Sequence, residues 1–218
     1  MVAVAVATLA VVSLGIAFTR LPLDWPLGGL YVRIMVTTGV VNLMCILVWN
    51  PKLIGRRAFP GPGTKSWDWV LLSLLGPAMV AVYLVAGLDG RPWGSAGPDA
   101  AWLVGMGLHV LAFLLLTWCT AVNPFFEKTV RIQTENEHRV IDHGPYTVVR
   151  HPGYVGFSLW LLSAPLLLAS RWAWIPAVLA VVLFVVRTAL EDRMLQAELP
   201  GYADYAARTR FRLIPGVW

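Results

Sequence analysis

Charged residues are scarce in this 218-residue sequence. Asp, Glu, Lys and Arg make up 13% of it and hydrophobic residues 58%, whereas an ordinary soluble domain has about 25% and roughly 45–50%. The apolar residues also come in long blocks, and a block of about 18 or more can cross a bilayer as a helix. This composition excludes a typical soluble domain and predicts an all-α integral membrane protein.

Cysteine is nearly absent as well. Only Cys45 and Cys119 occur, and each lies inside an apolar run, where a small buried thiol is ordinary. We infer neither a disulfide nor a metal site from them. The sequence also lacks internal repeats and low-complexity tracts, so no repeat architecture competes with the membrane interpretation.

Six apolar blocks are long enough to propose as membrane helices: residues 2–18, 30–49, 69–88, 101–122, 154–169 and 172–190. Only Ser170 and Arg171 separate the last two, so these helices are expected to form an antiparallel hairpin. The first block could instead be a signal peptide, but no Lys or Arg precedes its apolar stretch, as such signals normally require. We expect an N-terminal four-helix region, 1–122, and a second region, 123–218, that contains the hairpin and a polar tail.

The net charge of +5 and the isoelectric point near 9.6 could suggest nucleic acid, but the basic residues lie between the apolar blocks. One side of the predicted membrane topology has Arg20, Arg91 and Arg171. The other side has twelve: Lys52, Arg56, Arg57, Lys65, Lys128, Arg131, Arg139, Arg150, Arg193, Arg208, Arg210 and Arg212. The positive-inside rule therefore places both termini and the polar segments 123–152 and 191–218 in the cytoplasm, at the inner membrane if the host is bacterial. Membrane lipids rather than nucleic acid are the expected surroundings.

The segment before the hairpin is dense in functional side chains. Three histidines, two arginines and two tyrosines fall within residues 138–154, more than a connecting loop needs. Gly144-Pro145 is typical of a turn, and His151-Pro152-Gly153 should begin the fifth helix with proline in its first turn. Taken alone, Arg150-His151 favours a helix end anchored among lipid headgroups. Together with its neighbours it indicates a site.

Two other chemistries fit this segment poorly. No second cluster of Cys, His and carboxylate residues completes a four-coordinate metal set. Ser158 and Ser163 lie in apolar sequence without a nucleophile elbow around them, which argues against a Ser-His-Asp arrangement.

Ionisable residues also lie at the other end of the hairpin. Arg187 and Glu191 are four residues apart and so share a helix face; ionisable groups at membrane depth are costly and usually functional, although an ion pair between the two within one helix would also explain them. Pro200-Gly201 should end that helix. Beyond it, the three-residue spacing of Tyr202, Tyr205 and Arg208 favours, taken alone, an interfacial aromatic belt with a basic edge.

In combination, these elements resemble the isoprenylcysteine carboxyl methyltransferase family. The resemblance rests on residues 138–146, on Arg150-His-Pro-Gly-Tyr154, on the Arg-x-x-x-Glu-Asp-x-x-Leu helix of 187–195, and on Gly201-Tyr-Ala-Asp-Tyr-Ala-Ala-Arg208. The stretch Gly63-Thr-Lys-Ser-Trp-Asp68 is also similar to bacterial members. Two departures are Asp192, where a second glutamate is usual, and Glu198-Leu-Pro-Gly201, where many members have Phe-Gly.

The resemblance implies a methyltransferase that uses S-adenosyl-L-methionine and a lipophilic methyl acceptor from the bilayer. It implies that Arg187 holds the substrate carboxylate, with Arg150 and Arg208 assisting as catalytic residues and Tyr205 contacting the substrate. The implied cofactor-binding residues are His138, Arg139, Val140, Ile141, Tyr146, His151, Pro152, Gly153, Tyr154 and Glu191.

Carboxylate methylation suits a site without a recognisable base, because a carboxylate with a pKa of about 3.5 is already ionised at neutral pH. Three other hypotheses stay open. A phospholipid or other lipid N-methyltransferase would differ only in the nucleophile. An NADPH-dependent sterol-type membrane reductase shares an Arg-His element and an ending like Phe211-Arg-Leu-Ile-Pro-Gly216, but residues 187–198 lack the Arg- and Cys-rich stretch associated with it. The third is a non-enzymatic membrane scaffold.

Overall fold

The computed structural model describes residues 26–58, 60–89 and 98–218, and all regular elements within these ranges are helical. The longer helices are α2 (Pro26–Trp49), α4 (Ser66–Asp89), α5 (Ala100–Val122), α6 (Pro152–Leu167) and α7 (Trp174–Glu198). The shorter ones are α3 (Lys52–Ala58), α8 (Tyr202–Arg208) and the 3-10 turns η2 (Thr134–Asn136) and η3 (Gly144–Thr147). The expected all-α membrane fold is confirmed for these residues.

Among the described residues, four helices are long and apolar enough to cross a membrane: α2, α4, α5 and α7. They coincide with the second, third, fourth and sixth predicted segments. The first predicted segment, residues 2–18, lies outside the described residues.

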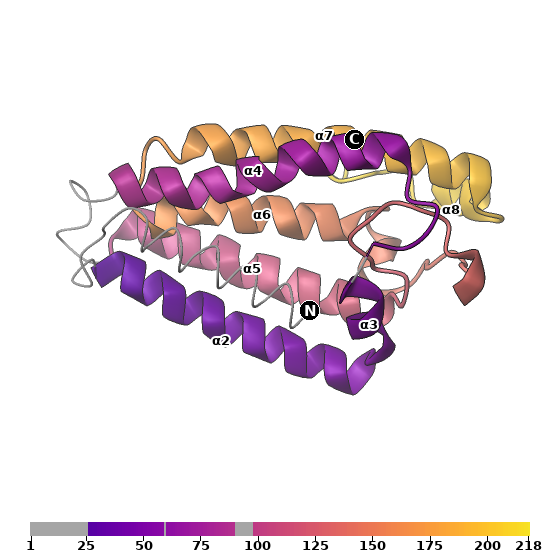
Figure 1. The fold of residues 1–218 in the computed structure, drawn as a ribbon, viewed down its shortest axis with the longest axis horizontal. Helices are drawn as coiled ribbons and strands as arrows, with labels where there is room; N and C mark the ends of the chain where they lie inside the picture. Colours follow the sequence, from indigo (N-terminus) through magenta and orange to yellow (C-terminus); the bar gives the residue numbers. More distant parts are fainter. Residues whose placement is uncertain (1–25, 59, 90–97) are drawn as a thin grey trace.

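The fifth predicted segment corresponds to α6, which is shorter than the other membrane helices. It has sixteen residues, or about 24 Å of helix against a hydrocarbon core of about 30 Å. Helices α4, α5 and α7 all pack against it, so it lies inside the bundle (Figure 1). Together with α7 it forms the predicted antiparallel hairpin (Figure 1).

Small residues bring α5 and α6 close together. A Cβ atom at Gly105 of α5 would lie 2.7 Å from Leu166 of α6, and one at Gly156 of α6 would lie 2.8 Å from Leu116 of α5. Such close backbone approach is how membrane helices gain packing energy without a hydrophobic driving force between them. This contact fixes the start of α6, where the polar segment enters the bundle.

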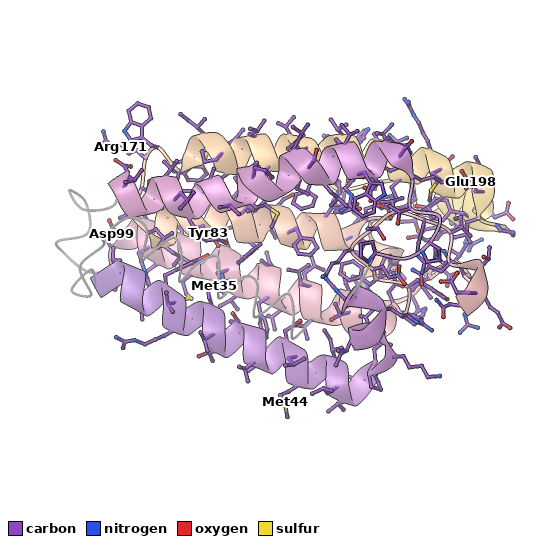
Figure 2. All side chains as sticks on the ribbon, in the orientation of Figure 1. Met35, Met44, Tyr83, Asp99, Arg171 and Glu198 are labelled. Carbon is purple, nitrogen blue, oxygen red and sulfur yellow. The ribbon has the colours of Figure 1, made fainter. Side chains whose placement is uncertain are left out.

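The polar parts of the described chain gather at one end of the bundle. Helices α3 and α8 and the loop between α5 and α6 lie there together (Figure 1), and Figure 2 shows side-chain nitrogen and oxygen atoms concentrated around them. A small hydrophobic cluster supports this end: Tyr146, Met194, Leu199, Tyr202 and Tyr205, with neighbours.

Candidate functional site

A cavity of about 480 Å³ lies where the polar end meets the helices, a volume suited to a small organic ligand. Its inner wall is apolar and comes from α4, α6 and α7: Leu72, Leu75, Met79, Phe157, Trp160 and Phe184. Its outer wall comes from residues 123–154 and 187–205. Residues of both polar segments thus line one pocket, and the pocket is amphiphilic.

Asp192 of α7 organises the outer wall. The carboxylate is fully buried and accepts hydrogen bonds from Arg150 Nε and Nη2 at 2.7 and 2.8 Å, and from Arg212 Nε at 2.8 Å. The Tyr202 hydroxyl donates to it at 3.1 Å and His151 Nε2 lies 3.2 Å away. The interpretation of Arg150 and His151 as a headgroup anchor is therefore wrong, because both are buried and bound to Asp192.

The remaining contacts of Arg150 join it to the C-terminal tail. Its Nη1 donates to the carbonyls of Thr209 and Arg210, each at 2.8 Å, and its backbone N–H donates to Phe211 at 2.9 Å. Burial works against the charge, but the hydrogen bonds to Asp192 outweigh it and hold the pKa of Arg150 above its usual value. Most donors of this guanidinium are thus occupied by the protein itself.

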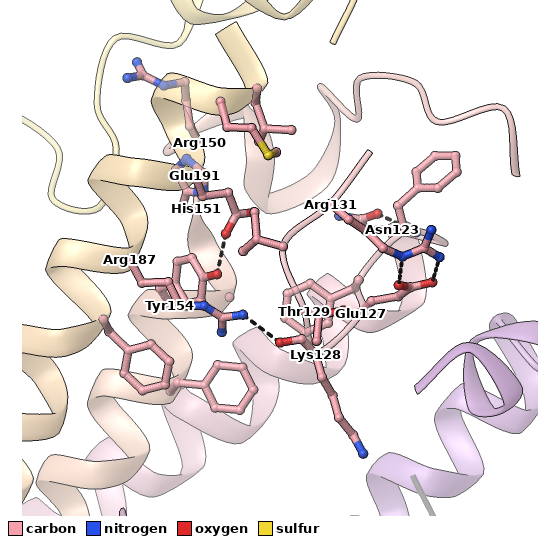
Figure 3. A pocket seen from close by; sticks show the side chains of 18 of the residues that line it. Asn123, Glu127, Lys128, Thr129, Arg131, Arg150, His151, Tyr154, Arg187 and Glu191 are labelled. Carbon is pink, nitrogen blue, oxygen red and sulfur yellow. Dashed lines mark hydrogen bonds and ion pairs between the residues drawn. The ribbon is translucent and has the colours of Figure 1, made fainter. Parts of the chain in front are cut away.

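Arg187 of α7 is bound to Asp68 at the start of α4. Its Nε and Nη2 donate to the two carboxylate oxygens at 2.7 and 3.0 Å. Its Nη2 also donates to the Lys128 carbonyl at 2.7 Å (Figure 3). Asp68 is fully buried and also accepts from the Val130 N–H at 2.8 Å. The hypothesis of an ion pair between Arg187 and Glu191 is therefore wrong. Within the described chain, Nη1 of Arg187 keeps no hydrogen-bond partner, and the guanidinium lies 5.5 Å from the centre of the Tyr154 ring.

Glu191 faces the cavity one helical turn beyond Arg187. Its carboxylate accepts a hydrogen bond from the Tyr154 hydroxyl (Figure 3). The Tyr154 ring packs against Phe184 at 5.4 Å and against His151 at 5.9 Å. A carboxylate beside aromatic rings is a suitable environment for a cationic ligand group.

His138 presents a neutral imidazole to the cavity. Its Nδ1 accepts the Gln133 N–H at 3.3 Å, and its ring packs 4.5 Å from Phe125. Burial, reinforced by the positive charge of Arg131, lowers the pKa of His138 to about 4. At neutral pH the proton therefore lies on Nε2, which makes that nitrogen a hydrogen-bond donor.

Three tyrosines, Tyr146, Tyr202 and Tyr205, contribute to the outer wall of the cavity. Tyr146 accepts a hydrogen bond from Asn123 Nδ2 at 2.8 Å, and the Tyr205 hydroxyl donates to the Tyr146 carbonyl at 2.7 Å. Tyr202 and Tyr205 are 4% and 2% exposed. The aromatic-belt interpretation is therefore wrong for both, since they face the cavity and not the lipid interface.

The sequence matches the model of the isoprenylcysteine carboxyl methyltransferase (ICMT) family over residues 104–197. This stretch of the chain is therefore similar to the ICMT family. The match contains α6, α7 and the loop before them, which supply most of the cavity wall. The ICMT resemblance inferred from the sequence motifs is thus confirmed.

Relatives and a solved structure agree with the family. The chain is 40% identical over 45 residues to a probable protein-S-isoprenylcysteine O-methyltransferase of Oryza sativa subsp. indica, covering 21% of this chain and 24% of that protein. It is 24% identical over 183 residues to the protein-S-isoprenylcysteine O-methyltransferase of Tribolium castaneum, covering 81% and 62%. The matches thus cover less than two thirds of the length of either curated relative. The structure of the eukaryotic intramembrane Ras methyltransferase ICMT matches with a TM-score of 0.59 at 19% identity, covering 99% of this chain and 75% of that one, and this likeness shows the fold alone.

The structure brings most of the residues implied by the ICMT resemblance to the cavity. They are His138, Arg139, Val140, Ile141, Tyr146, Arg150, His151, Gly153, Tyr154, Arg187, Glu191 and Tyr205. Pro152 and Arg208 are not among its lining residues. Pro152 is the first residue of α6, and Arg208 lies at the surface, 3.2 Å from Asp142.

Some residues at this end of the bundle lie outside the expected set. Asp68 closes the Gly63–Asp68 stretch, and the sequence signal that could have marked it is an acidic residue at the start of an apolar helix. Asp192 was noted only as a departure from the family pattern. Arg57 and Phe126 have no sequence motif that marks them, because they reach the cavity only through the packing of α3 and of the loop after α5.

Proposed function

We propose that the protein is a membrane methyltransferase that uses S-adenosyl-L-methionine to esterify the carboxylate of an isoprenylcysteine-like or other lipophilic substrate. The observation that carries this proposal is the amphiphilic cavity, with an apolar wall inside the bundle and a polar wall at its end. A lipophilic acceptor partitions into the bilayer and a cofactor into water, so a shared site belongs where the two phases meet. The names of the relatives support the same chemistry.

The polar wall fits the proposed cofactor. The Glu191 carboxylate, beside the rings of Tyr154 and Phe184, offers an anion and π faces to a cation. The His138 Nε2–H, with Tyr146 and residues 139–141 nearby, offers polar contacts for the remainder. When bound there, S-adenosylmethionine would supply a methyl group on a positively charged sulfur.

The protein's own part is to orient the acceptor and exclude water. A carboxylate needs no proton removed at neutral pH, so the site has no need of a general base. Positioning alone can supply several kcal/mol, up to roughly 7–11 kcal/mol in well-aligned systems. Arg187 is rigidly held by Asp68 and keeps Nη1 available, and we assign it a directional contact with the acceptor carboxylate.

The arrangement of Lys and Arg supports a cytoplasmic location for this site. The polar end carries Lys65, Lys128, Arg131, Arg139 and Arg193, among other basic residues. By the positive-inside rule this end faces the cytoplasm, where the cofactor would be available.

Two variants test the division of roles. Arg187→Lys keeps a charge for Asp68 but loses the planar fork, so it should raise the KM for an acid acceptor and leave S-adenosylhomocysteine affinity nearly unchanged. Glu191→Gln should do the reverse, because it removes the anion that faces the cofactor. Isothermal titration and steady-state kinetics in lipid nanodiscs measure both effects. Equal losses of both affinities in each variant would contradict the proposal.

A further inference from the structure

Arg57 of α3 is a buried cation with no anionic partner in the part of the chain that the structure describes. The residue is 8% exposed, its Nε is enclosed without a hydrogen-bond partner, and within the described ranges no carboxylate forms an ion pair with it. Burial lowers the pKa of Arg57 to about 10, so the group still carries its charge at neutral pH.

The other buried arginines around the cavity are all neutralised. Arg131 pairs with Glu127 at 2.9 Å and with Glu135 at 2.6 Å. Arg150 and Arg187 pair with Asp192 and Asp68. Arg57 therefore differs from them in kind, since removing a charge from water without a partner costs several kcal/mol.

The surroundings of Arg57 place its charge at the cavity wall. The guanidinium lies 5.2 Å from the centre of the Phe126 ring, which stacks on Phe157 at 6.3 Å. Arg57, Phe126 and Phe157 all line the cavity. Lys128 also lines it, and its pKa is lowered by burial and then by repulsion from Arg57. This part of the wall thus holds two cations that repel each other.

Residues 126–128 connect this wall to Arg187. Arg57 lies over the ring of Phe126, and Arg187 donates to the Lys128 carbonyl at 2.7 Å. Arg187 brings no net charge, because Asp68 cancels it. An anion that contacts both arginines would be oriented by a hydrogen bond from Arg187. It would also supply the countercharge that Arg57 lacks.

We propose that Arg57, assisted by Lys128, forms an anion-binding subsite of the cavity that holds the carboxylate of the lipophilic substrate. This inference rests on the proposed function and deepens it. The ionised acid neutralises the buried cation, whereas the methyl ester carries no charge. The subsite therefore also favours release of the product.

The test compares an acid with its own ester. The probes are N-acetyl-S-farnesylcysteine and its methyl ester, bound to the full chain in phosphatidylcholine nanodiscs. A hydrogen-bonded charge pair is worth at least about tenfold in affinity, so the wild type should prefer the acid by at least that factor. Arg57→Gln should abolish the preference and raise the KM for the acid by a similar factor, with S-adenosylhomocysteine affinity unchanged. Lys52→Gln, the same loss of charge at an exposed position of α3, should leave all three quantities as in the wild type.

Two further measurements keep the result interpretable. Arg57→Gln should melt no lower than the wild type when unliganded, because it removes an unpaired buried charge; a lower midpoint would indicate a structural arginine and overturn the proposal. Arg57→Lys, which keeps the charge, should retain part of the preference for the acid, and its complete loss there would count against a charge-based subsite.

The remaining outcomes separate this inference from its alternatives. If S-adenosylhomocysteine affinity falls in Arg57→Gln, the subsite belongs to the cofactor and the inference is wrong. If phosphatidylglycerol in the nanodisc competes with the acid and Arg57→Gln removes that competition, a lipid headgroup is the occupant and the substrate assignment is overturned. Discrimination between acid and ester without any methyl transfer would support the subsite and contradict the proposed function. Methyl transfer with an unchanged KM in Arg57→Gln would contradict the subsite alone.

Discussion

The ion pair between Asp68 and Arg187 joins α4 to α7 at the mouth of the cavity, and its strength can be measured. Asp68→Asn keeps the shape of the side chain but removes the charge that compensates Arg187. Both side chains are buried, at 0% and 7% exposure. Removing one partner of a buried pair costs about 3–5 kcal/mol, because the other charge is left in a poorly solvating environment. For a chain of this size that cost lowers the unfolding midpoint by about 6–20 °C.

The assay is thermal unfolding of the purified protein in one fixed detergent. Glu198→Gln is the matched control, because it also converts a carboxylate to an amide in an ion pair, with Lys65 at 2.7 Å, but both side chains there are 30–43% exposed. That change should cost about 0–1 kcal/mol. Replacing both partners by apolar residues, Asp68→Leu with Arg187→Met, should recover much of the loss. Equal effects of Asp68→Asn and Glu198→Gln, or strict additivity in the double variant, would refute the reasoning.

Three further predictions concern the cavity wall. Gly153→Ala would place a Cβ against the ring of Phe126, which would have to shift and disturb its stacking on Phe157, so thermal melts should show a loss of about 1–3 kcal/mol. Gly107→Ala is the control, because a Cβ there meets no atom within 4 Å and should not destabilise. The pKa of His138 is about 4 in the folded protein and about 6.5 in the unfolded chain, so its contribution to stability is complete above pH 6.5 and is lost as the pH falls toward 4. The melting midpoint plotted against pH over that range should therefore have a shallower slope for His138→Gln than for the wild type. Identical slopes would count against a buried neutral imidazole. Asp192→Asn should lower the melting midpoint by at least as much as Asp68→Asn, because Asp192 binds two arginines. It should also weaken the junction of α6, α7 and the C-terminal tail, so limited proteolysis of residues 209–218 should accelerate in this variant alone.

Hydropathy and turn chemistry predicted much of the fold correctly. Apolar blocks located α2, α4, α5 and α7, and the expected turn at Gly144-Pro145 and the break at Pro200-Gly201 both occur, with left-handed glycines at 144 and 201. Helix α6 is shorter than a typical membrane span, and block length alone does not show that its neighbours enclose it. Helix α3 was not expected, because its seven residues are too short for a periodic signal.

The motifs predicted which residues surround the cavity better than they predicted which charges pair there. Residues 138–141, Tyr146, Tyr154 and Glu191 all line it. The Arg187 partner was missed because spacing within one helix favours Glu191, whereas the actual partner is 119 positions away in the sequence. The same limit applies to Tyr205, whose burial depends on the packing of α8 against α7.

The central claim is tested most directly by following a labelled methyl group. Purified protein is incubated with S-adenosylmethionine carrying a labelled methyl, and with a prenylcysteine, a phosphatidylethanolamine and total host lipids in parallel. The account predicts label in the prenylcysteine or another lipophilic acid, released as methanol by mild alkali as esters require, and S-adenosylhomocysteine should protect the protein from thermal unfolding where NADPH does not. Folded protein that labels none of these acceptors, or that NADPH alone protects, would contradict it.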